Sequence, residues 1–268
     1  MDPLRVMSFN LRYGTANDGK NRWDLRKEAV AAVVQKLDPD ILGVQEGLLF
    51  QLEFLKDHLK GYAYTGVGRD DGQQAGEFTA IFYRVRRFEF LHGDTFWYSD
   101  TPSTPSRTWG NRCLRICTYA RLRTLDAGEE FFVFNTHLGL RSRARAKSAH
   151  FLHQKLYELA GGQPTLVTGD FNCGPTSKPY RLFTSGGLRD SFVARLPHVP
   201  DDLATFHNWS GKAQARFPRR AFTRMDWVLH SSHFEALAYD VCYEPVDGRY
   251  PSDHFPVVAD LFAQSWCF

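Results

Sequence analysis

The sequence has 268 residues, 43% of them hydrophobic, which is enough for one large domain or two small ones with a sizeable core. The net charge of +3 is too small to identify a nucleic-acid-binding protein by itself, although it would not repel polyanions. No apolar run approaches the length of a membrane span, and residues 1–5 carry no secretory signal. The five cysteines cannot all pair within the chain, and no two of them form a CxxC. We therefore expect reduced thiols and a cytoplasmic protein.

The first 60 residues alternate between strand-like and helix-like segments. Apolar runs predict strands over residues 4–9 and 41–44. Apolar residues at helical spacing predict helices over residues 21–37, with Asn21 as the N-cap, and over residues 48–59. Both strands end in polar side chains, so this part reads as strand, helix, strand, helix.

The rest of the chain mixes strands with two further helices, and no linker or composition shift marks a domain boundary. The expected strands are residues 62–67, 78–83, 88–91, 115–122, 131–136, 164–167, 225–229, 239–243 and 255–261, and the expected helices are residues 142–159 and 176–183. We expect a single domain over residues 1–268. Helices separated by runs of strands indicate two facing sheets with helices outside, an α/β fold.

One strand exit stands out, because an apolar run over residues 164–167 leads directly into Gly169-Asp170-Phe171-Asn172. Alone, an Asp after a strand is more often a turn or a helix cap. The same placement recurs along the chain, however, and functional groups usually gather at such strand edges and loops. The polar residues at or just past strand ends are Asn10, Glu46, His137, Asp170, Asn172, Asp226, Asp253 and His254.

These residue types supply three kinds of chemistry. Carboxylates suit Mg²⁺ or Mn²⁺. An Asp–His pair suits proton transfer, with Asp226 as the expected partner of His254 because an Asp inside an apolar strand needs one. Neutral Asn and His side chains, with Arg115 nearby, suit an oxyanion such as phosphate.

Six motifs in a fixed order carry a resemblance to a known family. They are Ser8-Phe9-Asn10, Gln45-Glu46, Asn135-Thr136-His137-Leu138, Gly169-Asp170-Phe171-Asn172, Met225-Asp226-Trp227 and Ser252-Asp253-His254. The chain resembles the endonuclease/exonuclease/phosphatase superfamily, which includes deoxyribonuclease I, over residues 6–261. The resemblance implies a four-layered α/β sandwich, two facing mixed β-sheets flanked by helices, with the site at one rim of the sheets.

The resemblance also implies a role for each matching residue. Glu46 would be the principal ligand of Mg²⁺ or Mn²⁺, with Asn10 beside it and Asp253 as a second ligand or a group behind one. Asp170 would orient or deprotonate the attacking water. Asn172 would bind the phosphate. His254, polarised by Asp226, would transfer a proton or contact the phosphate. His137 would belong to the site, as in the deoxyribonuclease I and deadenylase branches. Arg12 stands where some repair enzymes carry Asp, which argues against a repair-type metal site.

The expected activity is metal-dependent hydrolysis of a phosphodiester, with nucleic acid as the first choice of substrate. Phosphoinositide, sphingomyelin or another small phosphoester is the alternative, and a silent phosphate-binding module is the third. Arg219 and Arg220 lie among aromatic residues, as in single-strand binders, and are expected to contact phosphates, although a solvated loop is an equal alternative. The basic segment 141–147 is either a solvated helix face or the lining of a phosphate groove. Phe96-Trp97-Tyr98 is expected in the core or at an interface, rather than as a stacking platform. We expect a monomer.

Overall fold

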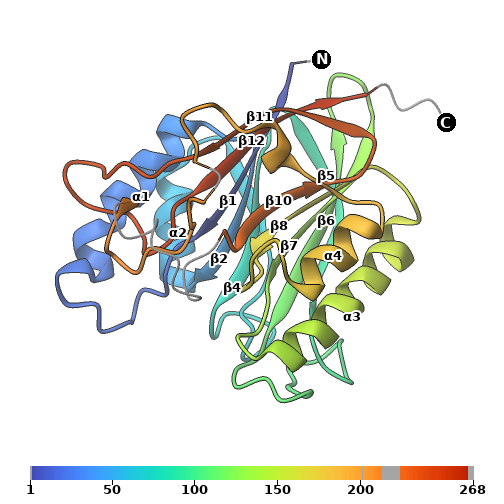
Figure 1. The fold of residues 1–268 in the computed structure, drawn as a ribbon, viewed down its shortest axis with the longest axis horizontal. Helices are drawn as coiled ribbons and strands as arrows, with labels where there is room; N and C mark the ends of the chain where they lie inside the picture. The colour runs from blue at the N-terminus through green and yellow to red at the C-terminus, as the bar shows by residue number, and fades with distance from the viewer. Residues whose placement is uncertain (1, 201, 213–223, 265–268) are drawn as a thin grey trace.

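A computed structural model describes residues 2–200, 202–212 and 224–264, and in it two six-stranded sheets face each other (Figure 1). The first sheet contains β1 (Leu4–Asn10), β2 (Ile41–Gly47), β3 (Tyr62–Thr65), β4 (Phe78–Arg84), β11 (Phe234–Val241) and β12 (Val257–Ala263). The second contains β5 (Phe88–Trp97), β6 (Ile116–Thr124), β7 (Glu130–His137), β8 (Thr165–Asp170), β9 (Arg189–Asp190) and β10 (Asp226–His230). The strand orders are β11-β12-β1-β2-β4-β3 and β5-β6-β7-β8-β10-β9.

Helices cover the outer faces of both sheets (Figure 1). The α-helices are α1 (Trp23–Leu37), α2 (Leu49–His58), α3 (Ser142–Ala160) and α4 (Lys178–Ser185), and two short 3₁₀ helices are η1 (Gly19–Asn21) and η2 (Ser191–Ala194). The first two α-helices lie on one side of the molecule, and α3 and α4 lie on the other (Figure 1). None of the described helices combines the length and the apolar character that a membrane span requires.

Three apolar cores hold the four layers together. The middle core joins the inner faces of the two sheets and includes Ile81 and Val133. A second core packs α1 and α2 on the first sheet, and a third packs α3 and α4 on the second, for example Leu152 against the strands. This arrangement confirms the predicted α/β sandwich of two facing mixed sheets with helices outside.

The pairing of strands places the polar strand ends at one edge of the sheets. In the first sheet β1 runs parallel to β2, and Asn10 pairs with Gln45. In the second sheet β7 runs parallel to β8, so that His137 is the neighbour of Asp170. On the other side of β8, the antiparallel β10 pairs Asp226 with Asp170. His137, Asp170 and Asp226 therefore form one row across three strands.

Some element boundaries differ from the prediction. Asn21 does not cap α1, because it ends η1, and the residue before α1 is Arg22, which makes no side-chain capping bond. Strand β5 continues six residues beyond the predicted end at residue 91, because residues 92–97 remain paired with β6. This extension buries Phe96, Trp97 and Tyr98, which confirms that they belong to the core.

Candidate active site

A β-bulge presents Glu46 to the site. Val44 pairs with Ala80 and Gly47 pairs with Phe78, so Gln45 and Glu46 together stand opposite a single residue of β4. Bulges of this kind re-aim a side chain and are frequent beside active sites. The backbone of Glu46 has φ 59°, in the left-handed region that non-glycine residues seldom occupy. Such strain persists only where the surrounding structure enforces it.

Asn10 joins the carboxylates that the two sheets contribute. Its amide nitrogen donates to Glu46 Oε1 at 3.2 Å and to Asp170 Oδ2 at 3.0 Å. Its amide oxygen accepts from the backbone N–H of Arg12 at 2.9 Å. The backbone N–H of Tyr13 donates to the other oxygen of Glu46 at 3.1 Å. Asn10 thus fixes both carboxylates, and the nitrogen rather than the oxygen of its amide faces them.

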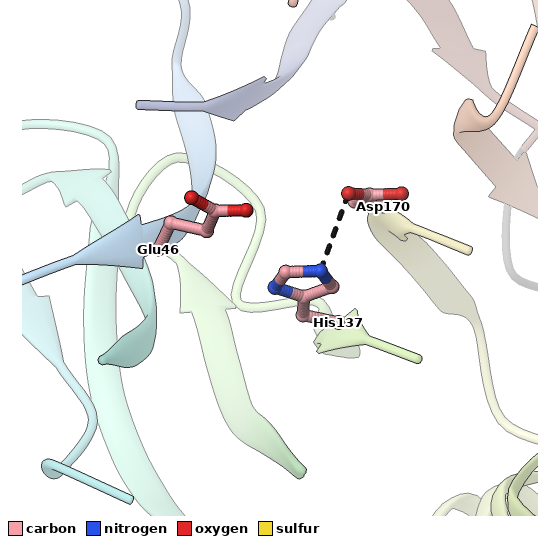
Figure 2. A group of neighbouring side chains, drawn as sticks. All are labelled: Glu46, His137 and Asp170. Atoms are coloured by element: carbon pink, nitrogen blue, oxygen red, sulfur yellow. Dashed lines mark ion pairs between the residues drawn. The ribbon is translucent and has the colours of Figure 1, made fainter. Parts of the chain in front are cut away.

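The side chains of Glu46, His137 and Asp170 converge from three separate strands (Figure 2). Each offers a ligand atom within 4.8 Å of the others. Asp170 Oδ2 is 3.3 Å from His137 Nε2, and burial, Arg115, Arg69 and His254 all lower the pKa of His137, which keeps its imidazole neutral. Two carboxylates beside a neutral imidazole form a donor set that fits a divalent cation.

Asp170 is buried at the centre of the row of strand ends. Burial raises its pKa to about 7, with contributions from the charges of Asp226 and Glu46, although the His254 charge acts in the opposite direction. The backbone N–H of Asn172 donates to Asp170 Oδ1 at 2.8 Å and orients the carboxylate. A carboxylate with a pKa near neutrality is suited to act as a general base.

His254 pairs with Asp226, as the sequence predicted. The distance from His254 Nδ1 to Asp226 Oδ2 is 2.9 Å. Burial alone would lower the pKa of His254, but Asp226, together with Asp170 and Asp253, raises it to about 10. His254 is therefore an imidazolium at neutral pH, with Nε2 3.9 Å from Asp170 Oδ2.

Hydrogen bonds tie the turn that carries Asp253 and His254 to the end of β1. The Ser252 hydroxyl donates to the Asn10 carbonyl at 2.7 Å and accepts from the His254 N–H at 3.3 Å. Burial and the charge of Glu46 raise the pKa of Asp253, while His254 and Arg12 act against this rise. The Nε atom of Arg12 lies 3.8 Å from Asp253. Asp253 is thus near enough to Glu46 for the two charges to interact.

A cavity of about 680 Å³ opens over these groups, and we call it the catalytic cavity. The predicted residues that line it are Glu46, Arg115, His137, Asp170, Asn172, Asp253 and His254. Asn10 and Asp226 are fully buried and act through the residues that they hold. Arg219 and Arg220 lie outside the described residues.

Two of the lining residues have donors suited to phosphate. Asn172 has φ 52°, and its side-chain amide donates to the Leu138 carbonyl at 2.9 Å, which holds it at the wall of the cavity. One terminal nitrogen of Arg115 is buried and has no hydrogen-bond partner among the described residues. Because an unpaired buried donor is costly, such a group points to a missing acceptor.

Four residues outside the predicted set of site residues also build the site. Arg12 lines the catalytic cavity and is held by two 3.0 Å hydrogen bonds to Asp18. Arg145 also lines it, donating to the Leu140 carbonyl at 2.8 Å, while its Nε has no partner within the described residues. The third residue is Glu77, which lies 3.9 Å from His137 Nδ1. The fourth is Arg26, which donates hydrogen bonds to carbonyls of two loops at the site. Arg12 left a signal in the sequence as a departure from the superfamily pattern, and Arg145 did so as part of the basic segment 141–147, whereas Glu77 and Arg26 left none.

Comparison with known proteins identifies the family. The model of the Endonuclease/Exonuclease/phosphatase family matches residues 7–254. The chain belongs to this family. The match covers every site residue from Asn10 to His254, and enzymes of the family hydrolyse phosphoesters and depend on divalent metals.

Similar proteins include a phosphatase and a probable RNA exonuclease. A structure of the Bacteroides thetaiotaomicron mannosyl-6-phosphatase is 36% identical, covers 97% of this chain and 99% of its own, and has a TM-score of 0.85. Nocturnin of Drosophila melanogaster is 27% identical over 97% of this chain, which spans only 47% of that protein. A probable RNA exonuclease of Saccharomyces cerevisiae is 25% identical over 62% of this chain and 35% of its own length.

Proposed function

We propose that this protein is a divalent-metal-dependent phosphoester hydrolase that cleaves phosphodiester bonds of nucleic acid. The observation that carries the proposal is one cavity in which the Glu46 and Asp170 carboxylates adjoin the Asp226–His254 pair. This combination supplies a cation site, a base near neutrality and a fixed positive charge, which are the groups that hydrolysis of an anionic ester requires. The RNA exonuclease among the relatives supports the choice of nucleic acid.

Each residue has a separate task in this proposal. Asp170 orients the attacking water and accepts its proton. His254, held by Asp226, donates a charge-assisted hydrogen bond from Nε2 to the phosphate. Arg115 and Asn172 bind the other phosphate oxygens.

We propose Glu46 of the Glu46, His137 and Asp170 group as the principal cation ligand and Asp253 of the same cavity as a second ligand, with Asn10 fixing the geometry of Glu46. A bound divalent cation neutralises phosphate charge and stabilises the leaving oxygen. We propose Mg²⁺, or Mn²⁺ in its place, because the candidate ligands are oxygen atoms of carboxylates.

A second candidate is hydrolysis of a small phosphomonoester, such as a sugar phosphate. The observation that favours it is the 36% identity with the mannosyl-6-phosphatase over nearly the whole chain. The three arginines of the cavity, Arg12, Arg115 and Arg145, also suit a dianionic monoester, which carries one charge more than a diester.

A substrate panel with Mg²⁺ and Mn²⁺ separates the two candidates. It contains a labelled RNA and DNA oligonucleotide, bis(p-nitrophenyl) phosphate, and a hexose 6-phosphate. The first proposal expects cleavage of an oligonucleotide that stops with chelator and is lost in Glu46→Ala and Asp170→Asn. Release of phosphate from the hexose phosphate, with both oligonucleotides intact, would replace it with the second candidate.

We also propose the domain organisation, the location and the oligomeric state of the protein. One domain over residues 1–268 is supported by the family match over residues 7–254. A cytoplasmic location is supported by Cys113, Cys117, Cys173 and Cys242, which are free thiols. A monomer is proposed as the oligomeric state.

A further inference from the structure

Positive charge is concentrated in two segments of the chain. Residues 101–115 and 138–147 contain seven of the 33 basic residues and none of the 30 acidic ones. The rest of the chain therefore has 26 basic and 30 acidic residues, a net negative charge. The seven residues are Arg107, Arg112, Arg115, Arg141, Arg143, Arg145 and Lys147. A weakly basic protein thus carries a strongly basic region.

The two segments pack against each other and enclose a second cavity. The Arg141 guanidinium donates to the Gly110 carbonyl at 3.3 Å. Gly139 lies so close to Asn111 that an added Cβ would be 2.2 Å from the Asn111 amide oxygen. The cavity has a volume of about 440 Å³, and its lining consists of Trp109, Gly110, Arg141, Arg143, Ala144 and Lys147. We call it the basic cavity.

The cations of the basic cavity have no carboxylate partner among the described residues. Arg141, Arg143 and Lys147 are exposed, and none lies within 4.0 Å of a carboxylate in the described part of the chain. Asp100, which contacts Trp109 of this wall, accepts a hydrogen bond of 2.8 Å from the Trp109 indole. Because the indole also packs on Phe151 at 5.7 Å, its ring is fixed in position.

The basic cavity adjoins the catalytic cavity. The segment between them lines both: Leu140 and Arg145 face the catalytic cavity, whereas Arg141 and Ala144 face the basic one. Leu140, between the cavities, is 71% exposed. Positive groups therefore continue from Arg115 and Arg145 in the catalytic cavity to Arg143 and Lys147 beyond it.

We propose that the basic cavity is a second phosphate subsite, which holds the backbone of a single-stranded nucleic acid next to the scissile phosphate. Single-strand binders combine cationic grooves with fixed aromatic rings, as Arg141, Lys147 and Trp109 do here. A small phosphoester fits within the catalytic cavity and has no group to place in this second one. The inference rests on the proposed function, since it names the substrate class of the same site.

The test measures oligonucleotide binding without hydrolysis. Fluorescence anisotropy with a labelled 12-nucleotide single strand, in chelator, compares the wild type with Arg141→Gln/Arg143→Gln/Lys147→Gln across a salt series. The matched control is Arg22→Gln/Arg86→Gln/Lys60→Gln, which removes three exposed cations elsewhere. We expect the first triple variant to bind at least 10-fold more weakly, with a salt slope shallower by about two units, because each phosphate contact of a single strand contributes about 0.7. The control keeps the wild-type slope.

Three outcomes overturn the inference. One is wild-type protein that does not bind the strand, and another is an equal loss in both triple variants, which would show unspecific attraction. Hydrolysis of bis(p-nitrophenyl) phosphate in Mg²⁺, measured on the same proteins, reports on the proposed function separately. If the first triple variant hydrolyses this small ester like the wild type but keeps full strand affinity, the subsite fails while the hydrolase proposal stands.

Discussion

His254 donates through Nδ1 to Asp226 over 2.9 Å, and both residues are buried. A second Asp–His pair, Asp240 and His198, has nearly the same length, 2.8 Å, but is exposed to solvent. The two pairs use different imidazole nitrogens, Nδ1 in His254 and Nε2 in His198, and they also differ in burial and position. Only the buried pair stands beside Asp170, and there the surrounding carboxylates raise the pKa of His254 to about 10.

Replacing Asp226 with Asn removes the charge that keeps His254 protonated. We expect Asp226→Asn to lower kcat for phosphodiester hydrolysis by at least about 100-fold, the range in which single acid–base groups act. Steady-state kinetics with Mg²⁺ measure this loss, and circular dichroism checks the fold. The matched control is Asp240→Asn, which breaks the exposed pair and should retain full activity. Equal activities of the two variants would contradict the assigned role of His254.

The strand ends were predictable from the sequence because they depend on local pattern. The apolar run before Gly169 shows where a buried strand ends, and Asp170 follows it. The bulge that turns Glu46 was not predictable, since it arises from the register between β2 and β4, which are far apart in sequence. The superfamily motif named Glu46, whereas only the fold explains how it reaches the site.

Arg26 and Glu77 were missed in the sequence for the same reason. Arg26 has the spacing of a solvated cation on a helix, yet it is 1% exposed because carbonyls of two loops turn toward it. Glu77 likewise gains a neighbour, His137, from a segment distant in the chain. Single-residue patterns cannot report such contacts, which form only when both sheets are assembled.

Gly43 lies where the two sheets approach each other closely. An added Cβ would lie 2.1 Å from Thr168 Oγ1 and 2.8 Å from Asn135 Oδ1. Asn135 also accepts from Gln45 at 2.6 Å, so the clash falls on a hydrogen-bond network directly behind Glu46. We expect Gly43→Ala to lower the free energy of unfolding by about 1–3 kcal/mol, as overpacking does. Urea denaturation measures the loss, and Gly43→Ala/Thr168→Ala should lose less than the sum of the two single variants.

His230 should make stability depend on pH. Its Nδ1 lies 3.0 Å from the Ser231 carbonyl, its Nε2 is buried without a partner in the described structure, and burial lowers its pKa. The unfolded chain therefore binds a proton near the ordinary pKa of about 6.5, while the folded protein does not. It follows that His230 costs stability as pH falls below about 6.5 and has no such effect above it.

The measurement is urea unfolding in chelator at pH 7.5 and pH 5.5. We expect the wild type to lose about 1 kcal/mol more than His230→Asn between these values, since one proton contributes at most about 1.4 kcal/mol per pH unit. The same substitution at the exposed His150 is the control. A loss in His230→Asn as large as in the wild type would show that another group causes the pH dependence.

Arg26 connects the loop that follows β1 with the loop that precedes Asp253 and His254. Its guanidinium donates to the carbonyls of Leu11 at 2.6 Å, Pro251 at 2.8 Å and Arg12 at 2.8 Å. Leu11 follows Asn10, and Pro251 precedes Ser252-Asp253-His254, so Arg26 sets the distance between the two loops. A lysine has a single point of charge and cannot reproduce this spread of donors. Arg26→Lys should therefore lower the free energy of unfolding by about 1–3 kcal/mol.

The same substitution should also raise the Mg²⁺ concentration for half-maximal activity several-fold, because one loop that Arg26 holds carries Tyr13, which bonds to Glu46, and the other leads to Asp253. Arg22→Lys, at the exposed start of the same helix, is the control for both measurements. The Mg²⁺ dependence of activity is compared at a temperature at which all variants are fully folded. If Arg26→Lys is less stable but has the wild-type Mg²⁺ dependence, then Arg26 supports the fold without positioning the cation site.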